Sequence, residues 1–183
     1  MNLFYFVTTN NGKYREAKEI LKQFGITLMK INDEKPELQD LDMKRIVVHS
    51  AMVLSKKHRK SVIVEDSGLY LEAYRMFPGT LTRLVHHCIG FDGLFKLLEG
   101  KSRKAYFRSV VGYCEPGKNP IVFEGILRGS IADKPYKGAH PRLVHDEIFI
   151  PDGYERTLSL MLEEKQKISH RRQAFEKLGE YLK

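Results

Sequence analysis

Tryptophan is absent from the sequence, and cysteine occurs only twice, as Cys88 and Cys114. Neither cysteine has a second cysteine at the spacing of a zinc or thiol-redox motif, so no disulfide framework or cysteine-based metal site is indicated. The sequence also lacks an apolar run long enough to cross a membrane, and its first residues lack the charged segment and apolar core of a secretory signal. We therefore expect a cytoplasmic protein with no membrane partner.

The sequence contains enough apolar residues to form a hydrophobic core, since they make up 42% of its 183 residues. This length predicts a single domain covering residues 1–183. The chain has 31 lysines and arginines against 23 aspartates and glutamates, a net charge of +8. Such an excess favours an anionic partner, either a nucleic acid or a small phosphate compound. The densest basic run, residues 56–60, falls where a helix should end and where the helix dipole favours cations. A nucleic-acid-binding module is therefore the weakest interpretation, and we expect no stable nucleic-acid partner.

Apolar periodicity predicts an α/β fold with a mixed sheet. Residues 3–7 form an apolar strand, residues 8–13 a polar loop, and the following segment a helix that ends at Gly25. A strand at 27–31 completes a βαβ unit, which places the 8–13 loop at the ligand-binding edge of a parallel pair. The remaining predicted elements are a loop at 32–42, a helix over 43–54, strands at 61–64 and 69–74, a turn at 77–79, one or two helices within 81–98, an antiparallel hairpin of 105–114 and 121–130, an irregular loop at 131–146, a short strand at 147–150, and a final helix that Ser169 caps.

The stretch Ser61–Leu69 contains the first candidate metal-binding residues. A short buried strand leads directly into Glu65 and Asp66, and Gly68 can turn the backbone sharply. Two carboxylates at the end of a strand can hold a divalent metal through hard oxygen ligands. The alternative is an ordinary turn, because Asp-Ser-Gly is also common turn chemistry.

Two further segments carry candidate ligand groups. In the first loop, Thr8 and Asn10 offer hydrogen bonds and Lys13 a cation at a helix N-terminus, a set that suits a phosphate chain, although polar residues before a helix are also common caps. Near the C-terminus, Lys165 precedes Ser169-His170-Arg171, which suits carbonyl or phosphate oxygens or else forms a solvated cap.

The ordered set of these motifs resembles the inosine and xanthosine triphosphate pyrophosphatase family. The similarity covers nearly the whole chain, and its parts are Thr8–Lys13, Pro36–Gln39, Val64–Leu69, Phe77-Pro78-Gly79, Phe123–Gly129, Phe149–Gly153 with Thr157, and Glu164-Lys165 with Ser169-His170-Arg171. The resemblance implies an elongated two-lobed α/β fold with a long central mixed sheet and an active site in the cleft between the lobes. It also implies a homodimer that uses Mg²⁺ to hydrolyse ITP, dITP or XTP to the monophosphate and pyrophosphate.

The resemblance also implies roles for individual residues. Asp66 is the expected catalytic base. The expected metal ligands are Glu37, Asp66 and Glu65; the phosphate ligands are Thr8, Asn10, Lys13 and Lys165; and the base-binding residues are Ser169, His170, Arg171, Asp146 and Leu143. Donors directed at a 6-keto oxygen would reject ATP, because its amino group would leave them unpaired.

Residues 140–146 depart from the family pattern. This loop contains no Phe, Tyr or Trp, whereas the family uses an aromatic loop to sandwich the purine; Asp146 alone matches. Leu143 could pack on a purine face and His145 could stack on it. The departure leaves open an alternative, a nucleotide-binding homologue with altered base specificity or lost turnover.

Overall fold

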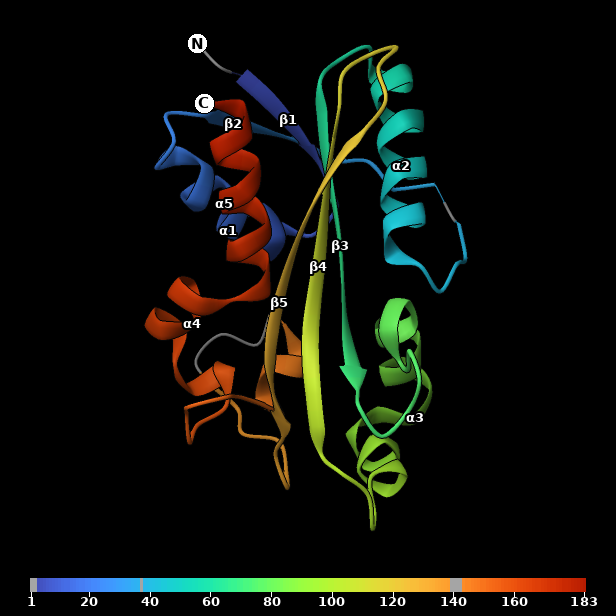
Figure 1. Cartoon of the computed structure of the whole chain (residues 1–183), viewed down its shortest axis with the longest axis vertical. Coiled ribbons are helices and arrows are strands. Elements are labelled where there is room, and N and C mark those ends of the chain that lie inside the picture. Colours follow the sequence, from blue (N-terminus) through green and yellow to red (C-terminus); the bar gives the residue numbers. More distant parts are fainter. Residues whose placement is uncertain (1–2, 37, 139–142) are drawn as a thin grey trace. The chain divides into compact units, whose positions relative to one another are not determined.

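The computed structural model describes residues 3–36, 38–138 and 143–183. Six strands form one sheet in the order β2-β1-β3-β4-β5-β6. Their bounds are β1 Leu3–Val7, β2 Thr27–Ile31, β3 Val62–Leu71, β4 Lys104–Cys114, β5 Ile121–Ile131 and β6 Phe149–Pro151. β1 pairs in parallel with β2 and β3, whereas β6 is antiparallel to β5, so the sheet is mixed. The helices are α1 Asn11–Lys22, α2 Met43–His58, α3 Thr82–Leu97, α4 Leu162–Ile168 and α5 His170–Leu182, and both kinds of element are labelled in Figure 1.

The predicted α/β class and the βαβ start are confirmed. β1, α1 and β2 follow one another as expected, with Tyr5 opposite Met29 in the parallel register. β4 and β5 are neighbours joined by residues 115–120, a connection too short for a parallel crossover, so they form the expected hairpin. The basic run at 56–60 ends α2, and Arg59 takes the left-handed conformation at its C-cap.

The prediction for the central stretch was wrong in one respect. Glu65 and Asp66 do not end a strand, and Asp-Ser-Gly is not a turn, because β3 continues through them to Leu71. Beyond the acids, Leu69 and Tyr70 are buried again. The Leu69 N–H donates to the Thr82 hydroxyl at 2.9 Å, and Tyr70 forms a bridge with Pro78. The segment around Phe77-Pro78-Gly79 thus pairs with β3 and satisfies backbone groups that would otherwise end it.

The chain divides into two compact units, which we call unit 1 and unit 2. Unit 1 comprises Met1–Ser67, Ser109–Gly125 and His170–Lys183, and unit 2 comprises Gly68–Arg108 and Ile126–Ser169. In unit 1, α1 and α5 lie on one face of the strands and α2 on the other (Figure 1). The core between the strands and the helices α1 and α5 is apolar. It contains Phe6, Ala17, Ile20, Leu21, Ile26, Leu28, Ile63, Val111, Tyr113, Ala174, Phe175 and Leu178.

Close packing fixes the start of α5 in unit 1. Gly125 of β5 lies directly under this helix, and a Cβ there would collide with the main-chain oxygen of His170 and meet the Ala174 nitrogen at 2.8 Å. The strand can approach the helix this closely because glycine has no side chain. The first residues of α5, His170 and Arg171, are therefore held firmly against unit 1.

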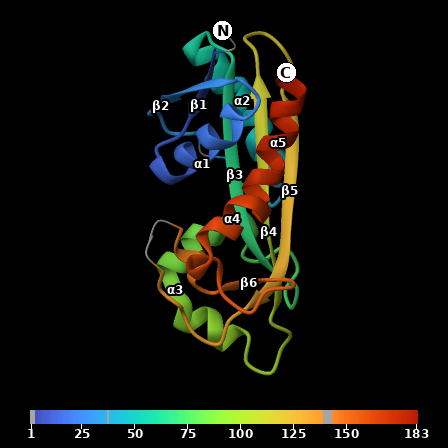
Figure 2. The same ribbon diagram turned by 90° about the vertical axis from the view of Figure 1, so that its left-hand side faces the viewer.

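Unit 2 has its own core of Leu69, Leu71, Leu94, Leu98, Ala105, Phe107, Leu127, Ile131, Ile148, Phe149 and Leu158. Its long helix α3 is kinked at Gly90, which has a positive φ. The region predicted to hold one or two helices therefore contains two helical segments that meet at this kink. A 3-10 turn at Val144–Glu147 displaces the predicted short strand, which begins only at Phe149. The helix α4 was not predicted, and Figure 2 shows it leading into α5.

In the part of the chain that the structure describes, no helix is both long and apolar enough to span a bilayer.

Candidate active site

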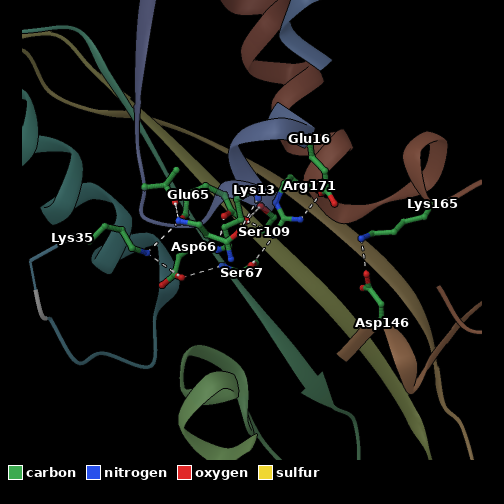
Figure 3. Close-up of polar contacts among 12 residues, drawn as sticks. Lys13, Glu16, Lys35, Glu65, Asp66, Ser67, Ser109, Asp146, Lys165 and Arg171 are labelled. Atoms are coloured by element: carbon green, nitrogen blue, oxygen red, sulfur yellow. Dashed lines mark hydrogen bonds and ion pairs between the residues drawn. The ribbon is translucent and has the colours of Figure 1, made fainter. Parts of the chain in front are cut away.

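The two adjacent acids of β3 have opposite environments. Because successive strand side chains point to opposite faces, Glu65 and Asp66 diverge from one backbone (Figure 3). The Glu65 side chain is fully buried, whereas the Asp66 side chain is 23% exposed. One carboxylate is thus enclosed by protein and the other is accessible to solvent.

Glu65 is enclosed by hydrogen-bond donors from three other elements. The Lys13 ammonium lies 2.6 Å from its Oε2, and the Arg171 guanidinium lies 3.3 Å from its Oε1. The Ser109 hydroxyl of β4 donates to Oε1 at 2.9 Å. The buried carboxylate therefore joins α1, β4 and α5 to β3.

Electrostatics keep Glu65 ionised. Burial alone would raise the pKa of Glu65, but the charges of Arg171 and Lys13 outweigh burial and hold the pKa well below its ordinary value. Burial also lowers the pKa of Lys13, and Glu65 opposes that effect. Because Glu65 is negative at neutral pH, it fixes the ammonium of Lys13 at the start of α1.

A fourth charge closes this network into a ring. The Arg171 guanidinium lies 2.6 Å from Oε2 of Glu16 and also donates to the Ser67 hydroxyl at 3.3 Å. Glu16 lies on α1 three residues after Lys13, a spacing that puts both on one helix face. This network, which we call the charge ring, therefore runs from Lys13 to Glu65, to Arg171, to Glu16 and back to α1.

Asp66 has a different partner. The Lys35 ammonium, from the loop after β2, lies 3.2 Å from Asp66 Oδ1 and also donates to the main-chain oxygen of Glu65 at 3.2 Å. A carboxylate and a carbonyl are both hard oxygen ligands of the kind that Mg²⁺ takes, so this face of β3 fits a divalent cation. Glu37, the other expected ligand, lies outside the described residues. Among those that are described, no three His, Cys, Asp or Glu side chains gather as a metal cluster.

The loop before α1 has the geometry of a helix cap. Asn10 is the N-cap, and its Oδ1 accepts from the Lys13 N–H at 3.0 Å. The Thr8 hydroxyl oxygen accepts from the Asn10 N–H at 3.1 Å. These bonds use side-chain oxygens, so the Asn10 amide NH₂ and the Thr8 O–H keep their capacity to donate. The cap and a phosphate-binding role are therefore compatible.

Unit 2 contains a second buried ion pair among the predicted residues. Lys165 of α4 lies 2.6 Å from Asp146, and the two side chains are only 7% and 10% exposed. Lys165 was expected to contact phosphate and Asp146 the base, whereas the structure joins them to each other. Leu143 is half-buried at the start of the same 3-10 turn.

An aromatic cluster adjoins this pair. The ring of His145 lies 5.1 Å from that of His86 and 6.1 Å from that of Phe91, centroid to centroid. Burial, and secondarily His86, lowers the pKa of His145 to about 4, so its ring is neutral at pH 7. His86 belongs to the segment His86-His87-Cys88, and the sequence has no second ligand pair at zinc spacing from it.

The structure brings together Lys13, Glu65 and Arg171 in unit 1, and Asp146 and Lys165 in unit 2. Ser169 is buried in an extended conformation before α5, and His170 is buried in its first turn.

The sequence did not predict three residues that contact the site residues. Glu16 could have been found from its helical spacing to Lys13, and Lys35 from its place two residues before Glu37. Ser109 gave no signal, because its contact is with a residue 44 positions away.

Comparisons with known proteins agree with the predicted family. The Ham1 family model matches residues 4–181. A dITP/XTP pyrophosphatase of Methanopyrus kandleri is 46% identical over 180 residues, covering 97% of this chain and 95% of that protein. Another of that name from Pyrococcus horikoshii is 38% identical, covering 98% and 96%. Among solved structures, a HAM1 protein from Coxiella burnetii superposes with a TM-score of 0.81 at 24% identity, covering 100% of this chain and 98% of that one, which supports the fold. A family match over nearly the whole chain, together with relatives of this identity, shows that the chain belongs to the Ham1 family.

Proposed function

We propose that this protein hydrolyses non-standard purine nucleoside triphosphates, namely ITP, dITP and XTP, to the nucleoside monophosphate and pyrophosphate. Removal of such nucleotides from the nucleotide pool would be its role. The observation that carries the proposal is the divided environment of β3, where Glu65 fixes a lysine while Asp66 stays accessible. Relatives named dITP/XTP pyrophosphatase support the substrate class.

The triphosphate would be held by positive charge in unit 1. Lys13 lies at the N-terminus of α1, where free N–H groups and the helix dipole favour an anion. Thr8 and Asn10 would donate to phosphate oxygens from the same loop, and Lys165 would add a further cation. Glu65 prepares this site by holding Lys13 in place before the substrate arrives.

Asp66, Glu37 and Glu65 are the proposed ligands of Mg²⁺. When bound, the cation would neutralise charge that develops on the phosphate oxygens. Both carboxylate oxygens of Glu65 already face cations or a hydroxyl, so its main-chain oxygen is the better placed ligand atom.

Asp66 is also the proposed general base. Its accessible carboxylate would accept a proton from the attacking water while the water oxygen bonds to the phosphorus of the nucleoside monophosphate and the bond from that phosphorus to the pyrophosphate group breaks. The proton lost by water ends on Asp66, and pyrophosphate leaves as the second product.

Base selection is assigned to donors near α5. Ser169, His170 and Arg171 would donate to the 6-keto oxygen, and Asp146 and Leu143 would complete the base pocket. Arg171 holds Glu65 and Glu16 as well, so it serves both the proposed pocket and the charge ring.

A pyrophosphate-release assay with Mg²⁺ tests the proposal, comparing ITP, dITP and XTP with GTP and ATP. We expect the first three to be preferred and Asp66→Asn to reduce release from all of them by about 10²- to 10⁴-fold. Release from none of the five by the native protein would support a binding homologue without turnover.

The homodimer, the single two-lobed domain and the cytoplasmic location belong to the same proposal. Light scattering tests the dimer.

A further inference from the structure

Lys35 occupies the oxygen atoms that a metal ion would need. Its ammonium lies 3.2 Å from Asp66 Oδ1 and 3.2 Å from the main-chain oxygen of Glu65 (Figure 3). The two side chains are 29% and 23% exposed, so the contact lies at the accessible edge of unit 1 and not in its core. A cation of the protein itself is therefore bound by a carboxylate and a carbonyl from consecutive strand residues.

An ammonium and a divalent cation compete for these two oxygens. Each oxygen has more than one lone pair, but the two positive charges would lie only a few ångströms apart and would repel each other. Lys35 lies between β2 and α2, where the described residues 32–36 and 38–42 contain no helix or strand, and its four-carbon stem can move the charge away. The contact is thus suited to exchange.

We propose that Lys35 is a built-in competitor of the metal, which occupies the Asp66 site in the free protein and must leave before a divalent cation binds. This inference rests on the proposed function for the identity of the metal ligands. It adds that the metal site is closed by a residue of the chain until a better partner for Lys35 arrives.

The triphosphate chain is such a partner. A polyanion would attract the displaced ammonium and so lower the cost of opening the site. Metal and nucleotide would then bind cooperatively, because each makes room for the other. The free protein would bind divalent cations weakly and the nucleotide-loaded protein strongly.

Mn²⁺ alone is the probe for the first test, with binding measured by the electron paramagnetic resonance signal of free Mn²⁺. Lys35→Met removes the competitor, and we expect the Kd for Mn²⁺ to fall about 3- to 10-fold, the scale of a partly buried ion pair. Lys44→Met is the matched control, because it removes an equal charge from an exposed ion pair with Glu124 in the same unit. Lys35→Met with Asp66→Asn should lose the gain.

An unchanged or raised Kd in Lys35→Met, or an equal fall in Lys44→Met, overturns the proposal. A second test uses the native chain, so that it does not depend on the folding of a variant. Acetylation of lysines, read by mass spectrometry, should label Lys35 faster at a saturating concentration of Mg²⁺ and leave Lys44 unchanged; equal labelling without Mg²⁺ and at saturation also overturns the proposal. Because neither readout involves turnover, failure here is distinct from failure to release pyrophosphate.

Discussion

Two lysine–carboxylate pairs of equal length lie in different surroundings. In unit 1, the Lys13–Glu65 pair spans 2.6 Å and has Arg171 as a second cation at 3.3 Å. In unit 2, the Lys165–Asp146 pair also spans 2.6 Å, but the residue before Asp146 is His145, which is neutral at pH 7 and packs against His86 and Phe91. The first pair lies within a charge ring and the second beside aromatic rings.

The difference indicates a division of work. A group of cations around one buried carboxylate suits a polyanionic phosphate chain, whereas the flat rings of the cluster at His145 suit a purine, which carries no net charge. Under the proposed function, changes at Lys13 or Glu65 should alter phosphate binding, and changes at Asp146 or Leu143 should alter base contacts.

The largest effect is expected from Asp66→Asn. Asparagine keeps the shape but cannot accept the proton, so kcat should fall by about 10²- to 10⁴-fold. Steady-state pyrophosphate release measures the change, and circular dichroism should show an unchanged fold because Asp66 is not buried. Native-like turnover in this variant would remove Asp66 from the centre.

Glu65→Gln and Asp146→Asn compare the two pairs directly. Glu65→Gln leaves Lys13 and Arg171 without their shared carboxylate, and removing one partner of a buried ion pair costs about 3–5 kcal/mol of unfolding free energy. Asp146→Asn should cost less, because it removes the carboxylate that faces the single cation Lys165, whereas Glu65→Gln removes one that faces both Lys13 and Arg171. Urea unfolding measures both, and an equal loss would show that the additional cation near Glu65 contributes nothing.

His170→Ala and Leu143→Ala separate base reading from base packing. An unpaired donor discriminates strongly between substrates, so His170→Ala should reduce the preference for ITP over ATP by about 10- to 100-fold. Leu143→Ala should lower kcat/KM for all purine triphosphates alike, because an apolar contact does not read the 6-position. The assignment is reversed if Leu143→Ala erases the ITP preference while His170→Ala keeps it.

The smallest effect concerns acid sensitivity in unit 2. The pKa of His145 is about 4 in the folded protein and about 6.5 when unfolded, so the unfolded chain binds the extra proton first. The contribution of His145 to stability is complete above about pH 6.5 and is lost as the pH falls toward 4. His145→Phe should therefore make the free energy of unfolding depend less on pH between pH 7 and 5.

His87→Gln is the control for that experiment, since His87 is an exposed histidine of the same helix as His86. It should leave the pH profile as in the native protein. An unchanged slope in His145→Phe would mean that the ring is not held neutral by its surroundings.

Local pattern predicted the elements whose signal lies within a few residues. The βαβ start followed from helical spacing after a short apolar strand, and the start of α5 from Ser169 ahead of Phe175 and Leu178. α4 was missed because only Lys165 is buried within Leu162–Ile168, so the segment has no apolar stripe.

The site was predictable as a set of residues but not as a set of contacts. Glu65 and Asp66 were identified together, but their separation onto two faces depended on β3 continuing to Leu71. That continuation depends on Thr82 and Pro78, which the sequence alone did not place beside the strand. Lys35, Glu16 and Ser109 likewise act through neighbours distant in the chain.

The charge ring has a consequence for the order in which the protein assembles. Glu16 and Arg171 are 155 residues apart, and unit 1 draws on three separate stretches of the chain, the last of which is α5. During synthesis, Lys13 and Glu65 therefore emerge long before their guanidinium partner, and unit 1 cannot close until α5 has been made. Contacts of such long range slow folding. A nascent chain ending before residue 170 should therefore display protease-sensitive unit 1 segments, and a ribosome-stalled series of lengths would locate the point at which protection appears.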